Sequence, residues 1–407
     1  LHDDREEYKM PRINITIALL LLLLALFLPS AAYAGTSTDE KGPVDQVINK
    51  QINSDGIKKI ENEIVKRQDK DFKNILDGFD PEKLVNDSAR GKFELSIKGI
   101  IERCLAYLLK EVYANISILV KLLVIIFLCS ILKNLQASFL SEGVGELAFY
   151  ACYIVMVGVL VAGFSTAMKM GMSIIDSMVV FMETAIPVLV ALMISGGNFA
   201  SAGAFQPILI MIVDIAALIM KNVLLPLIFL TAILSVVGNI SDKVQISKLT
   251  GLLKQISLWT MGTILTLFIA FITVQGTLGA AVDGVTGKTA KFAIGTFIPV
   301  AGKYLADAAD AVVGCTLLIK NAAGVAVMCG IVSICLIPIL KIFAIMLLYR
   351  LAGALVEPVS EKRIVNLLND IAGSFTYLIG IVASVAFMFL ISITAMINAG
   401  NVSTMIR

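Results

Sequence analysis

Five ionisable residues lie within, or at the edges of, apolar segments, where a charge could help to move ions or protons. They are Lys121, Glu183, Asp214, Lys221 and Lys341. A charge at the centre of a bilayer costs roughly 3 kcal/mol on insertion scales, so such residues are usually paired, hydrated or functional. Four of them, Glu183, Asp214, Lys221 and Lys341, are candidates for a polar pathway through a membrane. The alternatives are snorkelling near a helix end, which suits Lys121, an internal ion pair, or contact with a partner subunit.

Glu183 is the leading candidate because it directly precedes the segment Thr184–Val188, which contains Pro187. Asp214 comes next, since it lies inside a long apolar run. Lys221 shares a helical face with Asp214, but seven residues span about 10.5 Å along a helix, so the two are not a direct pair. Lys221 also fits a junction between two helices.

Familiar catalytic and metal-binding patterns are absent from the sequence. The one histidine, His2, precedes the expected start of the protein, which excludes histidine-based catalysis, metal sites and proton relays. The six cysteines form no C-x-x-C pair and are expected to be small buried hydrophobes. Gly287-Lys288-Thr289 resembles the end of a phosphate-binding loop, but Val282 stands where that motif needs its first glycine. We expect no enzyme activity, no cofactor and no metal, and any ATP hydrolysis must come from another protein.

The composition indicates a membrane protein. The chain has 407 residues, of which 58% are hydrophobic and 16% charged. The mean hydropathy is +0.89. A soluble chain of this size needs more charge to cover its surface. The net charge of +2 indicates no nucleic-acid partner. We predict an all-α, polytopic helical membrane protein with six to eight spans.

The N-terminal region is predicted to direct export. Residues 1–34 read as a signal peptide with Met10 as the true start, an apolar run, and Ala32-Tyr33-Ala34 as the cleavage site. Residues 35–93 then form a charged extracytoplasmic domain. In it, isoleucines at 57, 60 and 64 make a helical stripe, and Asp80-Pro81 is an N-cap followed by proline at the first helical position.

The rest of the chain divides into interfacial and membrane segments. Residues 94–114 form an amphipathic interfacial helix, whose apolar face carries Ile97, Ile100, Ile101, Cys104, Leu105, Leu108, Leu109 and Val112. The predicted units are a first span and loop at 115–146, a membrane repeat at 147–257, a second repeat at 258–373, and a last span and tail at 374–407. Apolar segments lie at about 115–132, 147–168, 178–195, 207–238, 258–280, 324–348 and 374–397.

An internal duplication supports the two repeats. Thr184 and Pro187 recur as Thr296 and Pro299 at an offset of 112 residues, within the shared pattern Thr-x-Ile-Pro-Val. Pro226 recurs as Pro338 at the same offset, and Trp259 recurs as Tyr377 at an offset of 118. The alternative is chance similarity among apolar helices. Internal repeats are common in transporters and channels, although membrane scaffolds have them as well.

The charge pattern bears on topology. The segments 242–256 and 359–372 read as basic amphipathic helices, which favours the cytoplasmic side. If both lie there, each repeat crosses the membrane an even number of times, and the short Pro-containing segments are re-entrant. Loops are then expected at 169–177, 196–206 and 281–323. This pattern favours six spans, whereas the apolar runs alone allow eight.

The layout resembles the stage III sporulation protein AE family of endospore-forming bacteria. The resemblance covers the mature chain and is carried by Glu183-Thr-Ala-Ile-Pro-Val, Ala204-Phe-Gln-Pro and Phe297-Ile-Pro-Val-Ala-Gly-Lys-Tyr-Leu-Ala-Asp-Ala. It implies a protein of the mother-cell membrane around the forespore. It further implies a channel or secretion-like complex with ring-forming proteins, small membrane proteins and a cytoplasmic ATPase. The charged N-terminal region would face the intermembrane space, and no catalytic residues are carried over.

Two functions remain open from the sequence. The leading hypothesis is a permease-like or export-gate subunit of that complex. The alternative is a non-conducting scaffold that holds ring subunits through residues 35–112 and cytoplasmic partners through 242–256 and 359–372. An intramembrane enzyme would need an aspartyl or Ser-Lys arrangement, and no motif supports one.

Overall fold

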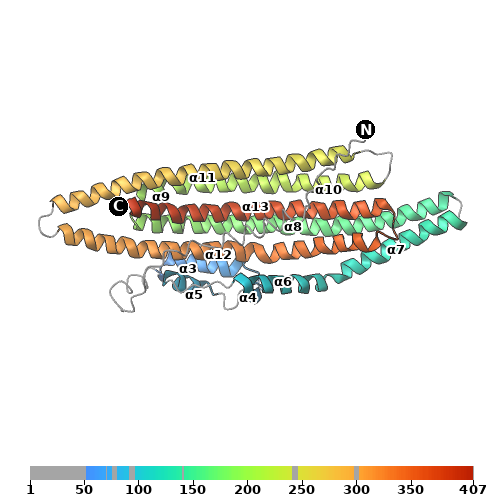
Figure 1. Cartoon of the computed structure of the whole chain (residues 1–407), viewed down its shortest axis with the longest axis horizontal. Helices are drawn as coiled ribbons and strands as arrows, with labels where there is room; N and C mark the ends of the chain where they lie inside the picture. Colours follow the sequence, from blue (N-terminus) through green and yellow to red (C-terminus); the bar gives the residue numbers. More distant parts are fainter. Residues whose placement is uncertain are drawn as a thin grey trace, which may run out of the picture.

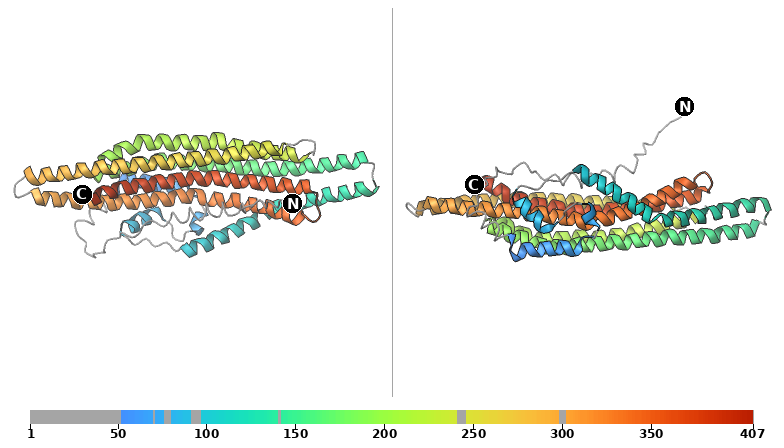
Figure 2. Two further views of the ribbon diagram at one scale, coloured as in Figure 1. Left: turned by 45° about the horizontal axis from the view of Figure 1, so that its top comes forward. Right: turned by 90° about the horizontal axis from the view of Figure 1, so that it is seen from below.

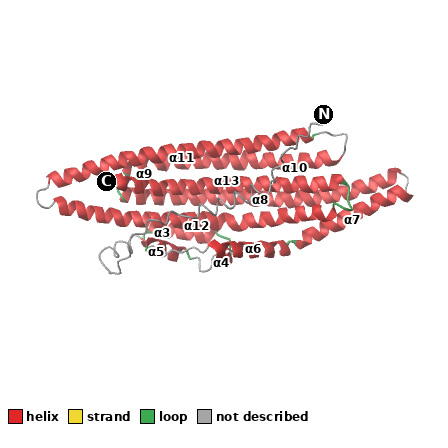
Figure 3. Ribbon diagram, in the orientation of Figure 1, coloured by secondary structure: helices red, strands yellow, loops and turns green. Residues whose placement is uncertain are grey.

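The protein is a bundle of long helices. The computed structural model describes residues 52–69, 71–75, 80–90, 97–139, 142–240, 246–297 and 302–406, and these contain no strand (Figure 3). The predicted signal peptide with Met10, as well as Pro299, lies outside the described residues. Six of the described helical stretches are long and apolar enough to cross a membrane. The all-α, multi-span prediction is thereby confirmed, at the lower end of its range.

The elements follow one another along the chain with short connections. The N-terminal helices are α3 (Asp55–Arg67), α4 (Phe72–Ile75), α5 (Pro81–Ala89) and α6 (Ile97–Ala114). The candidate spans follow as α7 (Ile116–Phe139), α8 (Glu142–Ser195), α9 (Phe199–Ile219), the π-helical turn η2 (Met220–Leu224), α10 (Leu225–Ile240), α11 (Ser247–Phe297), α12 (Gly302–Val356) and α13 (Lys362–Ile406). Helices α8 to α13 lie side by side, and α3 to α6 lie along α12 (Figures 1 and 2).

The long helices exceed the thickness of one bilayer. The candidate spans within α8 to α13 contain 38 to 47 residues. At 1.5 Å per residue they are ~57 to 70 Å long, whereas a hydrocarbon core of about 30 Å needs about 20 residues. Only part of each helix can therefore lie in hydrocarbon, and the remaining apolar surface must contact protein.

Helices α12 and α13 form the centre of the bundle. In the apolar 18-residue windows that mark the candidate spans, 72% of the residues of α13 and 67% of those of α12 are buried, against 17% for α11. The ring of Phe375 packs edge-on against Phe164 and Tyr349, with centroids 5.0 and 5.3 Å apart. A Cβ atom at Gly324 of α12 would overlap the side chain of Ile397 of α13. Small residues thus let the two central helices approach closely.

The predicted N-terminal domain does not stand apart from the bundle. In its described part, 52–90, Ile57, Ile60 and Ile64 are buried as the periodicity predicts, and α3 packs against α8 and α12. Asp80 caps α5, since its Oδ1 accepts a hydrogen bond of 3.1 Å from the Glu82 amide. This local prediction is confirmed.

Helix α6 corresponds to the amphipathic helix predicted at 94–114, but its apolar face is divided. One edge, which contains Ile100, Cys104 and Val112, packs against the bundle. The other edge, which contains Ile101, Leu105 and Leu109, stays exposed. The face is therefore wide enough to meet the bundle on one side and lipid or another protein on the other.

The duplication appears as two parallel hairpins. The offset of 112 residues relates the hairpin of α8 with α9–α10 to the hairpin of α11 with α12. Helices α8 and α11 run in one direction, and α10 and α12 run back (Figure 1). The described parts of 242–256 and 359–372 meet at one end of the bundle, where Lys254 and Asp370 form an ion pair. Each repeat therefore contains an even number of long helices.

The prediction of re-entrant proline segments is wrong where it can be examined. Pro187 lies inside α8 and Pro338 inside α12, and both helices are continuous. Pro187 has no amide hydrogen and cannot make the usual helical hydrogen bond. The neighbouring residues Ala185, Ile186 and Leu189 are buried, and their packing keeps α8 helical at this point. Pro226 follows η2, whose wider turn accommodates the missing donor. Thr296 lies in the last turn of α11.

Further boundaries differ from the sequence prediction. The expected loop at 169–177 is part of α8, because its polar residues lie on an outer face of the helix rather than in a connection. Most of the expected loop at 281–323 is helical as well. Residues 247–256 and 362–372 are the first turns of α11 and α13 rather than separate surface helices.

Candidate functional site

Three charged residues follow one another along the outer face of α8. Lys169, Asp176 and Glu183 are each seven residues apart, and all three are exposed. Seven residues are close to two helical turns, so they lie on one side of the helix. Within the candidate span Phe149–Ser195, every window of about 20 residues except 149–168 contains at least one of them. Almost any placement of this helix across a bilayer therefore puts an exposed charge at membrane depth.

An ion pair joins this row to the neighbouring helix. Lys221 Nζ donates hydrogen bonds to Asp176 Oδ1 and Oδ2 at 2.5 and 2.7 Å. Lys221 lies in η2, where the wider π-helical turn interrupts the regular spacing of side chains. Such turns are frequent at functional sites. The sequence prediction placed Lys221 at a helix junction but did not find Asp176.

Asp214 lies beside the same row. It is half-buried on α9, and its Oδ1 has no hydrogen-bond partner within the described structure. Helices α8 and α9 are antiparallel. Glu183 lies seven residues after Asp176 on α8, and Asp214 lies seven residues before Lys221, so both steps lead in the same direction along the hairpin. Both carboxylates are thus about 10.5 Å from the ion pair, at one level of the hairpin. We name Lys169, Asp176, Glu183, Asp214 and Lys221 together the charged face.

Lys341 lies apart from the charged face. Its Nζ donates to Asp69 Oδ2 at 2.9 Å, which joins α12 to the segment between α3 and α4. Burial alone would raise the pKa of the Asp69 carboxyl. Hydrogen bonds from Lys341 and from the Asp71 amide outweigh burial and hold that pKa below its ordinary value. The nearby Tyr107 hydroxyl donates to Asp71 at 3.2 Å, so α6 is tied to the same point.

The structure thus separates the four predicted pathway residues. Glu183, Asp214 and Lys221 share the charged face, whereas Lys341 belongs to the contact with the N-terminal segment. No hydrogen bond or ion pair joins any two of the four in the described structure. Lys121 is exposed on α7.

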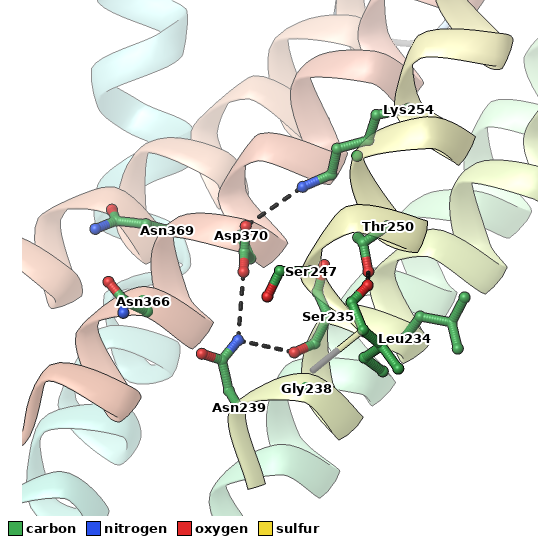
Figure 4. A pocket seen from close by; sticks show the side chains of 12 residues that line it. Leu234, Ser235, Gly238, Asn239, Ser247, Thr250, Lys254, Asn366, Asn369 and Asp370 are labelled. Atoms are coloured by element: carbon green, nitrogen blue, oxygen red, sulfur yellow. Dashed lines mark hydrogen bonds and ion pairs between the residues drawn. The ribbon is translucent and has the colours of Figure 1, made fainter. Parts of the chain in front are cut away.

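A polar cavity of about 360 Å³ lies where the two repeats meet (Figure 4). Lys254 of α11 donates to Asp370 of α13 at 3.3 Å, and Asn239 of α10 donates to the second carboxylate oxygen at the same distance. Asn366, Asn369, Ser235 and Thr250 are further lining residues. The opposite charges of Lys254 and Asp370 balance, so the lining offers mainly neutral hydroxyl and amide groups.

Sequence reasoning missed two buried charged residues. Asp283 of α11 accepts hydrogen bonds of 2.7 and 2.9 Å from the amides of Ala200 and Ser201, and so caps the N-terminus of α9 from another helix. Lys320 of α12 is 1% exposed and donates to the Ile397 carbonyl at 2.8 Å. Both residues lie in the stretch 281–323, which was expected to be a loop, so their charges were not considered. If this stretch had been predicted as helix, each residue would have been a candidate intramembrane charge.

The described residues contain no group of three or more histidine, cysteine, aspartate or glutamate side chains that could hold a metal. The charged face offers fixed charges, which attract, repel and hydrate ions. Such groups line polar pathways in membrane proteins.

The fold and the charged face define a multi-pass helical membrane protein with ionisable groups along an exposed helix pair. The chain belongs to the stage III sporulation protein AE family, whose model matches residues 79–400. It is 34% identical over 302 residues to the stage III sporulation protein AE of Bacillus subtilis (strain 168), which covers 74% of this chain and 76% of that protein. No solved structure matches the chain. The resemblance seen in the sequence is confirmed, and the protein is a sporulation protein.

Proposed function

We propose that the chain is a membrane-embedded, permease-like or export-gate subunit of the channel complex between mother cell and forespore, needed for forespore development. The observation that carries this proposal is the charged face. Asp176, Glu183 and Lys221 are exposed or half-exposed on helices that are otherwise apolar. Hydrocarbon would strongly disfavour this arrangement, whereas a water-filled path would stabilise it.

Membership of the stage III sporulation protein AE family supports the setting that we propose. The protein resides in the mother-cell membrane around the forespore, with its N-terminal segment on the extracytoplasmic side. Its partners are ring-forming proteins, small membrane proteins and a cytoplasmic ATPase. The ATPase would supply any ATP hydrolysis, because the chain carries no nucleotide-binding motif of its own. Its contribution is a path or gate rather than an enzymatic step.

Neutral substitutions on the charged face test this proposal. We expect Glu183→Gln and Asp214→Asn each to block forespore maturation while protein level and complex assembly stay normal, since neither substitution changes side-chain size. Glu361→Gln is the matched control, because Glu361 is an acid in an ion pair with Lys133, 2.9 Å away and outside the charged face. Spore counts with wild-type values for both test variants would refute the assignment.

A non-conducting scaffold remains the second candidate, and the exposed apolar surfaces favour it. Leu105 and Leu109 of α6 are 56% and 60% exposed. If the chain only assembles other subunits, Leu105→Gln with Leu109→Gln should abolish complex assembly while Glu183→Gln has no effect. Replacing 35–93 is a less suitable test, since Ile57, Ile60 and Ile64 belong to the core of the bundle.

A further inference from the structure

The interior of the described bundle is mainly apolar, and the buried charges of Lys320 and Asp283 are bonded to backbone groups. Its buried hydroxyl groups are largely turned back onto their own helices. Thr231 donates to the Leu227 carbonyl at 2.7 Å, and Ser384 and Ser392 donate to carbonyls four residues earlier at 2.8 Å. The surrounding side chains are apolar and closely packed. A conduit between α12 and α13 would have to displace this core, whereas the charged face already lies on the outside of the bundle.

The charged face has an apolar border. On α9, Met211, Ile215 and Leu218 are exposed by 56%, 51% and 57%. On α8, Val180 lies on the charged face itself, between Asp176 and Glu183, and is 38% exposed. A surface with charges along its middle and apolar side chains beside them can be sealed at its edges by another protein surface and still hold water along its centre.

Charge complementarity selects the partner that covers this face. A twofold axis parallel to the helices keeps both copies in one orientation across the membrane. It places α8 of one copy opposite α9 and η2 of the other. Each Asp176 then faces the partner copy's Lys221, and the four charges alternate in sign. The two ion pairs are therefore self-complementary without any change in the fold.

At the level of Glu183 and Asp214, the charges of the two copies repel each other and disfavour direct contact. The same axis brings Glu183 of each copy opposite Asp214 of the other, which gathers four carboxylates. Like charges in a dry interface are strongly unfavourable, so this level favours water over direct contact. The ion pairs then hold the two copies together, and the carboxylates line the gap between them.

We propose that two copies of this chain associate through the charged face about a twofold axis parallel to the helices, and that the path of the proposed export gate runs between them. The inference rests on the proposed function for the path. The association itself is measured independently.

Opposite charge reversals on separate copies test the association. Asp176→Lys places two cations on the face, and Lys221→Asp places two anions there. Each variant alone should dimerise about tenfold or more weakly than wild type. When the two variants are co-expressed with different tags, we expect mixed dimers to form and co-purify, because their faces are complementary. Mass measurement in lipid nanodiscs gives the number of copies.

The control reverses a pair outside the face. Lys133→Glu and Glu361→Lys, expressed separately or together, should leave the dimer unchanged. Asp176→Asn with Lys221→Gln provides a milder change if the reversals fold poorly, and should also weaken association. A monomeric wild type, undisturbed dimers of the single variants, or mixed variants that fail to pair would each overturn the proposal. Dimers that form as expected but pass no ions would uphold the interface and refute the export gate.

Discussion

Two helices matched at the offset of 118 residues lie in opposite surroundings. In α13, 72% of the apolar 18-residue window that marks the candidate span is buried, while in α11 the corresponding share is 17%. Trp259 of α11 is 71% exposed, whereas its counterpart Tyr377 of α13 is half-buried. Helix α13 thus lies at the centre of the bundle, and α11 forms part of its outer wall. The hairpin of α8 with α9–α10, which carries the charged face, also lies on the outside.

The same difference holds for the helices that carry the matched prolines. Helix α12 passes through Pro338 without interruption, whereas the first copy changes to η2 before Pro226. The more buried helix keeps regular geometry because neighbours surround it on most sides. The more exposed one accommodates a wider turn, and that turn presents Lys221. A duplicated pattern can therefore serve stability in one copy and a polar site in the other.

Aromatic truncation should separate the central helix α13 from the outer helix α11 most clearly. Phe375→Ala in α13 removes a fully buried ring that contacts Phe164 and Tyr349. We expect a loss of about 3 to 5 kcal/mol, which is typical for a buried phenylalanine. Trp259→Ala in α11 should lose less than about 1 kcal/mol, as expected for a surface substitution. Thermal unfolding in detergent measures both, and equal losses would refute the division into centre and wall.

The ion pair of Lys341 with Asp69 should contribute more to stability than the ion pair of Lys221 with Asp176, because it is less exposed. The side chains of Lys341 and Asp69 are 26% and 24% exposed, and those of Lys221 and Asp176 are 31% and 53% exposed. Lys341→Gln should therefore destabilise by about 1.5 to 3 kcal/mol. Lys221→Gln should cost about 1 kcal/mol or less in the isolated chain. Limited proteolysis should show residues 52–90 released only by Lys341→Gln.

Acid provides a check on the Lys341 contact. Because the pKa of Asp69 is lowered in the folded state, its stabilising effect is present above the ordinary carboxyl range. That effect is lost as the pH falls through the lowered pKa. The protease resistance of 52–90 should accordingly decline between about pH 4 and pH 2 in wild type. In Lys341→Gln this acid-dependent part should be reduced, and an unchanged profile would contradict the contact.

Local patterns in the sequence were sufficient for much of the fold. The isoleucine stripe of α3 and the Asp80 cap depend on neighbours within four residues, so periodicity reveals them. The polarity at 169–177 was misread as a loop because composition does not distinguish a connection from an exposed helical face. The pairs of Lys341 with Asp69 and of Lys221 with Asp176 join residues 272 and 45 positions apart. They depend on tertiary packing, which no local pattern encodes.

Thiol labelling along the helices tests the central claim most directly. In a cysteine-free background, Ser173→Cys and Val180→Cys introduce thiols on the charged face, and Leu267→Cys introduces one on the exposed outer side of α11. If the charged face lines a water-filled path, a charged, membrane-impermeant thiol reagent should label the two α8 positions in assembled complexes and leave the α11 position unlabelled. Absence of labelling at both α8 positions, in complexes that assemble normally, would contradict the account.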